Sequence, residues 1–218
     1  MQDGTFISRT IGIDVACGGK GADYTALATI DEYRVYETTG GEFDRVTVMK
    51  PHFVLQDMVR ENSLTLDKQL VWALKYIADN KKGPMRVVAD ATRELGFFIQ
   101  LQNALPPGTA FKCIWTGGMV VGREGREYHA SKAKTLMDLK SLMSIGALTV
   151  APKVRHLNDL IKEMQGFTFE DNGNGFLITS SAKHDDLAMA LACACLYPIE
   201  KKMFERASTP RVLPRLFR

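Results

Sequence analysis

The sequence predicts an α/β fold with a mixed sheet and helices on both faces, and three observations support this. Three strand-like segments come first, with no helical segment between them, as in an antiparallel meander. From residue 66 onward, helical and strand-like segments alternate, which is typical of β-α-β units. The chain has 218 residues, of which 45% are apolar and 24% charged, and this balance indicates one globular domain with a sizeable core.

The first strand is predicted at Arg9 to Ala16, where two kinds of side chain alternate. Isoleucine and valine occupy one face, whereas Asp14 shares the other face with the small residues Gly12 and Ala16. The small neighbours leave room beside the carboxylate. A Gly-rich loop is expected to follow at residues 17–23.

The remaining elements follow from the spacing of apolar residues and from breaks at Gly and Pro. Further strands are expected at residues 25–31, 34–38, 86–90, 111–115 and 148–151, with a β-hairpin at 167–170 and 176–179. Helices are expected at residues 66–79, 92–105, 130–145, 157–164 and from 184 or 185 to 197. The segments around Val46 and Phe53 fit no single state, and residues 117–127 form either a hairpin or a mobile loop.

Composition and spacing exclude several classes of protein. The longest uncharged run near the C-terminus, Leu187 to Ile199, has 13 residues, whereas a membrane span needs roughly 20. We expect no membrane association, and no signal peptide because no basic and then apolar stretch follows Met1. The four cysteines form no C-x-x-C pair and the four histidines have no zinc spacing, which favours reduced thiols in a cytosolic compartment and argues against a structural zinc site.

The net charge of +3 is unevenly distributed. Residues 199–218 hold six Lys and Arg against two Glu, so this end is basic while the rest of the chain is slightly acidic. We therefore divide the chain into a domain at residues 1–200 and a basic, flexible C-terminal tail at residues 201–218. Such a tail either contacts nucleic acid or an acidic partner, or only aids solubility.

Carboxylates occupy three informative positions. Asp14 lies in an otherwise apolar strand, and a buried carboxylate needs a cation or hydrogen-bond donors. Asp90 ends a buried strand, where ligands bind in open α/β sheets, although a capping role for the next helix is equally open to it. Asp185 and Asp186 open the last helix, where acidic residues are also ordinary caps. The small residues that follow them predict a helix packed close to the sheet.

Together these positions indicate more than each does alone. Acidic residues on the first strand, at the end of the fourth strand and at the start of a late helix can converge at one site. Oxygen donors without soft ligands suit Mg²⁺ or Mn²⁺, and two such ions ~3.5–4 Å apart activate water and stabilise the leaving oxygen in phosphodiester hydrolysis. We therefore interpret Asp14, Asp90, Asp185 and Asp186 as candidate catalytic and metal-binding residues.

Four segments resemble a known family. Residues Ile11 to Ala16, followed by a Gly-rich loop and Asp23 to Leu27, resemble the first motif of the nuclease domain of tailed-bacteriophage large terminase subunits. Val87 to Thr92 resembles the second acidic motif of that domain, and His129 to Lys134 resembles its middle segment. His184 to Ala192 is similar to the closing motif. The resemblance covers nearly the whole chain and depends on the order and spacing of these segments.

The resemblance implies an RNase H-like fold of the RuvC-like nuclease superfamily. It implies a metal-dependent endonuclease that cuts concatemeric double-stranded viral DNA during genome packaging. Two Mg²⁺ or Mn²⁺ ions would be held by Asp14, Asp90 and one or both of Asp185 and Asp186, with Asp14 as the bridge and Asp186 favoured over Asp185.

The resemblance also implies partners and a location. The terminase ATPase domain, the small terminase subunit, the portal and double-stranded DNA are the implied partners, in the cytoplasm of the infected bacterial host. The P-loop pattern G-x-x-x-x-G-K-[ST] of a terminase motor is absent here. We therefore expect a C-terminal nuclease portion or a stand-alone relative that does not translocate DNA by itself.

Five basic residues are candidates for contacts with DNA phosphates, and a solvated surface position is the alternative for each. They are Lys132, Lys134, Lys183, Arg123 and Arg126. Phosphate contacts of this kind provide affinity without reading the base sequence, and they make binding fall as salt rises.

Three other functions stay open at this point. A RuvC-like Holliday junction resolvase shares this arrangement of acids and would prefer four-way junctions to linear duplex. A non-catalytic module that docks on DNA or on the portal would use the acids as helix caps. A sugar-kinase-like ATPase also has a Gly-rich loop after an early strand aspartate, but the chain is short for two lobes and shows no second phosphate loop.

Overall fold

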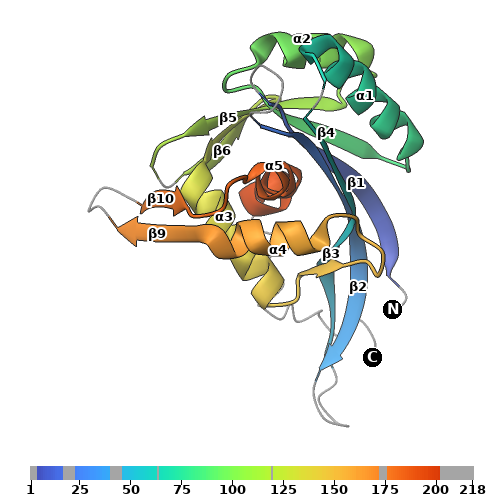
Figure 1. Ribbon diagram of the computed structural model, residues 1–218. Helices are drawn as coiled ribbons and strands as arrows, with labels where there is room; N and C mark the ends of the chain where they lie inside the picture. The colour runs from blue at the N-terminus through green and yellow to red at the C-terminus, as the bar shows by residue number, and fades with distance from the viewer. Residues whose placement is uncertain are drawn as a thin grey trace.

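One large mixed sheet organises the computed structural model, which describes residues 4–16, 23–39, 46–62, 64–118, 120–171 and 176–201 (Figure 1). Its eight strands are β1 (Thr5–Asp14), β2 (Thr25–Thr39), β3 (Val46–Glu61), β4 (Met85–Asp90), β5 (Ala110–Thr116), β6 (Val121–Glu124), β7 (Glu127–Ser131) and β8 (Leu148–Val150). A separate hairpin consists of β9 (Phe167–Asp171) and β10 (Phe176–Ser180). Most of the predicted Gly-rich loop, and the predicted basic tail after residue 201, lie outside the described residues.

The strands follow the order β6-β7-β5-β4-β1-β2-β3-β8 across the sheet. β1, β2 and β3 pair antiparallel, β4 pairs parallel with β1, and β5 and β7 extend the parallel part. β8 is parallel to β3 at the opposite edge. β6 is antiparallel to β7, so the segment at residues 117–127 leads into a hairpin. The predicted class, three antiparallel strands and then parallel strands, is confirmed.

Helices cover both faces of the sheet, as the sequence predicts. α1 (Leu66–Asp79) and α2 (Leu95–Ala104) pack on one face. α3 (Lys132–Ser144), α4 (Leu157–Gly166) and α5 (Asp186–Glu200) lie on the other, and Figure 1 shows α5 nearly end-on between the sheet and the other two. No helix within the described ranges has both the length and the apolar character needed to cross a membrane.

The second strand is longer than the sequence predicts. β2 runs without a break through residues 32 and 33, and the third strand of the meander is β3, from the segment that the pattern left ambiguous. Asp31 and Glu32 are both buried in the ladder although they are charged. Arg9, the cross-strand neighbour of Asp31, donates to it at 2.7 Å, and Ser8 donates to Glu32 at 3.1 Å. These partners compensate the buried charges, so the strand continues.

Two helices begin later than predicted. α2 starts at Leu95 rather than residue 92, because Asp90 accepts a hydrogen bond from the backbone N–H of Thr92 at 2.8 Å and holds a turn there. α3 starts at Lys132 rather than residue 130, because β7 occupies the preceding residues. Ser131 ends β7 and caps α3 by accepting a hydrogen bond from a first-turn N–H at 3.2 Å.

The alternation of β1 gives its two faces different environments. Ile11 and Ile13 are fully buried and pack with Phe97 and Leu101 in the core under α1 and α2. The opposite face of β1, which carries Gly12, is covered by α5. This is the division that the sequence predicts, and it determines which layer of the molecule can hold a polar site.

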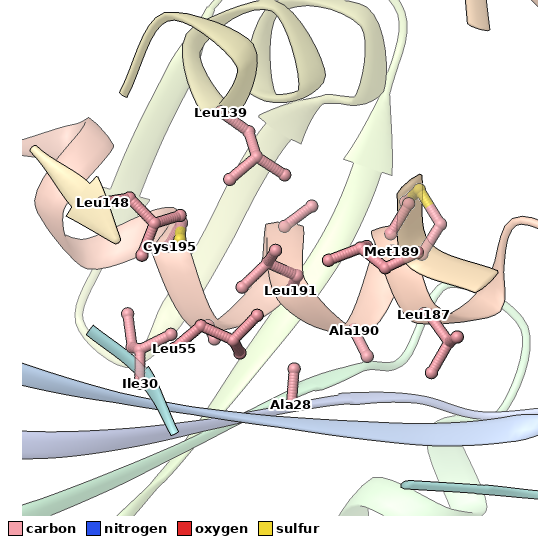
Figure 2. Close-up of a cluster of buried hydrophobic side chains, with 14 of the residues drawn as sticks. Ala28, Ile30, Leu55, Leu139, Leu148, Leu187, Met189, Ala190, Leu191 and Cys195 are labelled. Carbon is pink, nitrogen blue, oxygen red and sulfur yellow. The ribbon is translucent and has the colours of Figure 1, made fainter. Parts of the chain in front are cut away.

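α5 packs against the sheet through small side chains. Figure 2 shows Ala190 on the side of α5 that faces the strand carrying Ala28, and both residues belong to the same buried cluster as Leu191. A Cβ atom at Gly12 would lie 2.0 Å from the carbonyl oxygen of Ala190 and 2.4 Å from the backbone nitrogen of Ala194. Only glycine permits this approach, so the backbone of α5 rests directly on the backbone of β1.

We expect Gly12→Ala to lower the free energy of unfolding by about 3 kcal/mol or to prevent folding, because the new methyl group must push α5 away from β1. Gly96→Ala in α2 is the matched control, since nothing lies within 4 Å of a Cβ atom there. Alanine in that helix should stabilise by roughly 0.5–1 kcal/mol. Urea unfolding followed by circular dichroism measures both changes. An unchanged midpoint for Gly12→Ala would contradict the close approach of the two backbones.

Candidate active site

The ends of two neighbouring strands place two carboxylates at one edge of the sheet. β1 ends at Asp14 and β4 ends at Asp90, and the two strands are parallel. Ile13 pairs with Ala89 one residue before these ends. Residues at the same register share a face, and Asp14 lies two residues after Gly12, so both carboxylates are on the face that α5 covers.

The start of α5 brings two further carboxylates to the same place. Asp185 immediately precedes the helix and Asp186 is its first residue. A pocket of about 360 Å³ opens here, and its lining includes Asp14, Asp90, Asp185 and Asp186. We call it the carboxylate pocket. Its other lining residues are Val15, Ala16, Asp23, Thr92, Arg93, Glu94, Trp115, Lys132 and Met189. The structure thus brings together the four acidic residues that the sequence analysis selected.

Two of these carboxylates have partners within the protein. The Nζ atom of Lys132, the first residue of α3, lies 2.8 Å from an oxygen of Asp185. Asp90 uses one oxygen to accept the backbone hydrogen bond from Thr92. Because each of these contacts uses one carboxylate oxygen, the other oxygen of each group stays available to a ligand.

Asp14 experiences the combined charge of the other three acidic residues. Burial raises the pKa of Asp14 well above its usual value, and the negative charges of Asp90, Asp186 and Asp185 raise it further. Lys132 acts in the opposite direction. A carboxylate in such surroundings is stabilised by a proton or by a cation beside it.

Asp186 provides a more specific sign that a cation fits. Its side chain is buried, and burial raises its pKa to about 6, with further contributions from Asp23 and Asp185. Its Oδ2 atom is buried and has no hydrogen-bond partner in the described part of the chain. The nearest basic atom, Nδ1 of His184, lies 3.7 Å away, too far for a hydrogen bond. A buried oxygen without a donor is costly, and a divalent cation would remove that cost.

The donor set suits a hard divalent cation. The carboxylate pocket is lined by acidic oxygen donors and contains no His or Cys among its described lining residues. In the side-chain arrangement of the described residues, however, no three His, Cys, Asp or Glu groups are placed to hold a metal ion together. Asp185 is directed to Lys132, and Asp90 is directed to the backbone of the turn that follows it. Joint binding of a metal ion by three of these groups would therefore require rotation of some of their side chains.

Of the five basic candidates, only Lys132 lines the carboxylate pocket. Lys134 forms an ion pair within α3, and Lys183 lines a second pocket beside α4. Arg123 on β6 lies over an aromatic ring of β7, 5.8 Å from its centroid, and Arg126 is exposed in the turn between those strands. Contacts between these residues and DNA therefore stay predictions.

Sequence reasoning missed several residues of the pocket. Arg93 is exposed and forms no hydrogen bond or ion pair with the residues that the structure describes. Its position three residues after Asp90 was the available signal, because the turn after a strand end stays at the same edge of the sheet. Asp23 belongs to a segment of the first motif, but no role was assigned to it. Trp115 enters from β5, and its buried indole nitrogen also has no partner among the described residues.

Comparison with known proteins identifies the fold. No protein-family model matches the chain, and no curated protein matches it by sequence. The nuclease domain of the large terminase subunit of bacterial virus Sf6 matches with a TM-score of 0.60 over 88% of this chain and 89% of that domain, at 13% sequence identity. The fold is that of a large terminase nuclease domain.

Two further terminase structures are similar. A mutant from the large terminase subunit of bacteriophage Sf6, with calcium, matches with a TM-score of 0.59 at 13% identity, over 89% of each chain. The large terminase nuclease domain of bacteriophage SPP1, with bound Mn, covers 87% of this chain and 86% of that domain at 13% identity, with a TM-score of 0.47. The match to the Sf6 nuclease domain confirms the predicted RNase H-like fold and the resemblance to terminase nucleases.

The raised pKa of Asp186 predicts how stability depends on pH in protein freed of divalent cations. The folded protein keeps the Asp186 proton up to about pH 6, whereas the unfolded chain releases it near the ordinary value of 3.8. The contribution of Asp186 to the free energy of unfolding therefore falls as pH rises between these values. Asp186→Asn should stabilise the protein by about 1–3 kcal/mol at pH 7.5 and by almost nothing at pH 4.

Urea unfolding in a chelating buffer at the two pH values measures this difference. The exposed residue Asp79 supplies the control, because Asp79→Asn should leave stability unchanged at both pH values. If Asp186→Asn changed the free energy of unfolding by the same amount at both pH values, that result would show that burial does not raise the pKa of Asp186.

Proposed function

We propose that this protein is a metal-dependent endonuclease that hydrolyses phosphodiester bonds of double-stranded DNA, as the nuclease of a phage large terminase. The observation that carries the proposal is the meeting of Asp14, Asp90, Asp185 and Asp186 in one pocket, within the fold of a large terminase nuclease domain. These residues come from two strand ends and one helix start, so only the folded chain creates this concentration of negative charge.

The acidic residues have distinct proposed roles. Asp14, Asp90 and Asp186 are the proposed ligands of two Mg²⁺ or Mn²⁺ ions, with Asp185 as a further ligand. The unpartnered oxygen of Asp186 supports its assignment as a ligand. The similar Sf6 protein with calcium supports the use of a divalent cation. Asp14 is the proposed bridge, because it interacts electrostatically with all three of the others. When bound, such ions activate water and stabilise the leaving oxygen.

Basic residues at the pocket would bring the DNA backbone to these acids. Six acidic side chains line the pocket, against Arg93 and Lys132. A DNA phosphate therefore needs positive charge at the rim, and Arg93 is exposed and has no partner among the described residues. Lys132 instead orients Asp185 and reduces the repulsion among the acids. We assign phosphate binding beside the scissile bond to Arg93.

The proposal extends to the biological setting. The similarity to the Sf6 large terminase nuclease domain supports a role in cutting concatemeric viral DNA during packaging. Partners would be the terminase ATPase domain, the small terminase subunit and the portal, in the cytoplasm of the infected bacterial host. The site itself contributes the hydrolysis step of this process.

Removal of either strand-end carboxylate is the direct test of the site. Asp14→Asn and Asp90→Asn should lower Mg²⁺- or Mn²⁺-dependent nicking of supercoiled plasmid by at least about 100-fold, because each removes a proposed metal ligand. Circular dichroism should show that the fold survives. Asp79→Asn, an exposed change of the same chemistry on α1, should cut at the unmodified rate. Normal cleavage by either pocket variant would refute the assignment.

The choice of substrate distinguishes this proposal from the two main alternatives. Plasmid and linear duplex should be cut at least as fast as a four-way junction. A strong preference for the junction would identify a resolvase instead. Salt-sensitive DNA binding without any metal-stimulated cleavage would identify a non-catalytic docking module.

Arg93→Ala should weaken DNA binding and lower the slope of log affinity against log salt concentration by about 1, because one phosphate contact is lost. The measurement is fluorescence anisotropy with duplex DNA over a range of salt, in an Asp90→Asn background that prevents cleavage. Lys75→Ala, which removes an exposed positive charge from α1, is the control and should leave the slope unchanged. Equal slopes with and without Arg93 would exclude a phosphate contact there.

A further inference from the structure

A buried acidic residue outside the carboxylate pocket holds the start of α5. Glu163 lies on α4, and one of its carboxylate oxygens accepts a hydrogen bond from the backbone N–H of Ala188 at 2.9 Å. Ala188 belongs to the first turn of α5, where backbone N–H groups have no partner within the helix. The side chain of Asp185, at the N-cap position, makes no capping hydrogen bond. Glu163 therefore caps α5 from another helix.

Arg60 fixes the other oxygen of Glu163. Arg60, on β3, donates to this oxygen at 3.2 Å and to Asp159 at 2.9 Å. Its guanidinium group also lies over the ring of Tyr24, 4.6 Å from the ring centroid. Two of these partners lie on α4 and the third, Tyr24, immediately precedes β2, so Arg60 holds Glu163 in one orientation and joins β3 to α4.

The same arginine reaches Asp186 by a second route. The ring of Tyr24 meets the His184 ring edge-on at 4.9 Å between centroids. His184 in turn lies beside the unpartnered oxygen of Asp186. Two sets of contacts, one through Glu163 and one through Tyr24, therefore connect Arg60 to the turn that carries Asp186.

We propose that Glu163, held by Arg60, is a positioning residue that keeps the Asp186 carboxylate in place for metal binding. Glu163 acts through the backbone of α5, because it lines a neighbouring pocket of about 470 Å³ and is not among the residues that line the carboxylate pocket. Without this cap the first turn of α5 would fray, and Asp186 would lose its fixed position. The inference rests on the proposed metal-binding function of Asp186.

Mn²⁺ binding, measured by isothermal titration calorimetry, tests this role without any need for cleavage. Glu163→Ala removes both the cap and the partner of Arg60, and Mn²⁺ affinity should fall by roughly 10–100-fold. Glu163→Gln keeps an oxygen that can accept from Ala188 but loses the ion pair with Arg60, so its Mn²⁺ affinity should fall by an intermediate amount, about three- to tenfold. Asn158→Ala is the matched control, because Asn158 is an exposed residue of the same helix. Its affinity should stay within about twofold of the unmodified protein.

The thermal unfolding midpoint of each variant, measured without metal, separates positioning from stability. A lower midpoint with unchanged Mn²⁺ affinity in Glu163→Ala would show that Glu163 is only structural and would overturn the inference. If Glu163→Ala does not fold, the Mn²⁺ affinity of Glu163→Gln becomes the test. An affinity equal to that of the unmodified protein would then overturn the inference. Failure of the unmodified protein to bind Mn²⁺ would refute the proposed function of the pocket and this inference with it. Equally tight binding by every variant would refute this inference alone.

Discussion

The direct contact between the backbones of β1 and α5 at Gly12 is the constraint on which the rest of the structure depends. From Gly12 to Asp14 the strand advances by about 6.6 Å, and the four residues from Ala190 back to Asp186 span about 6 Å along the helix axis. The two carboxylates therefore come to the same level on facing elements. Larger side chains at the contact would separate the layers, and no change in the acids themselves could restore the site.

This arrangement concentrates like charges, and the protein compensates them only in part. The charge of Lys132 stabilises Asp185, and the N–H of Thr92 stabilises Asp90. Asp14 and Asp186 nevertheless have raised pKa values. The apolar layers on the two faces of the sheet must supply the stability that the site removes, which fits the largely buried helix α5 at the centre of the larger core.

The sequence predicts the fold class and the acidic residues because both depend on local pattern. The alternation around Asp14, the strand end at Asp90 and the pair before a helix of small residues are all visible in short windows. Features that depend on distant partners could not be predicted. β2 continues through Asp31 because Arg9, 22 residues earlier, pairs with it. The sequence only weakly indicates that Arg93 lines the pocket, through its position three residues after Asp90. It does not indicate the role of Glu163, because the partners of Glu163 come from β3 and α5. The metal-binding roles themselves stay predictions.

The ion pair between Lys132 and Asp185 places a positive charge of the protein's own among the crowded carboxylates. The ammonium group of Lys132 opposes the rise in the pKa of Asp14 that the neighbouring acids cause. Under the proposed function, an incoming cation would compete with this lysine for an oxygen of Asp185. The rotational freedom of one side chain on α3 would then help to set the apparent affinity of the pocket for ions.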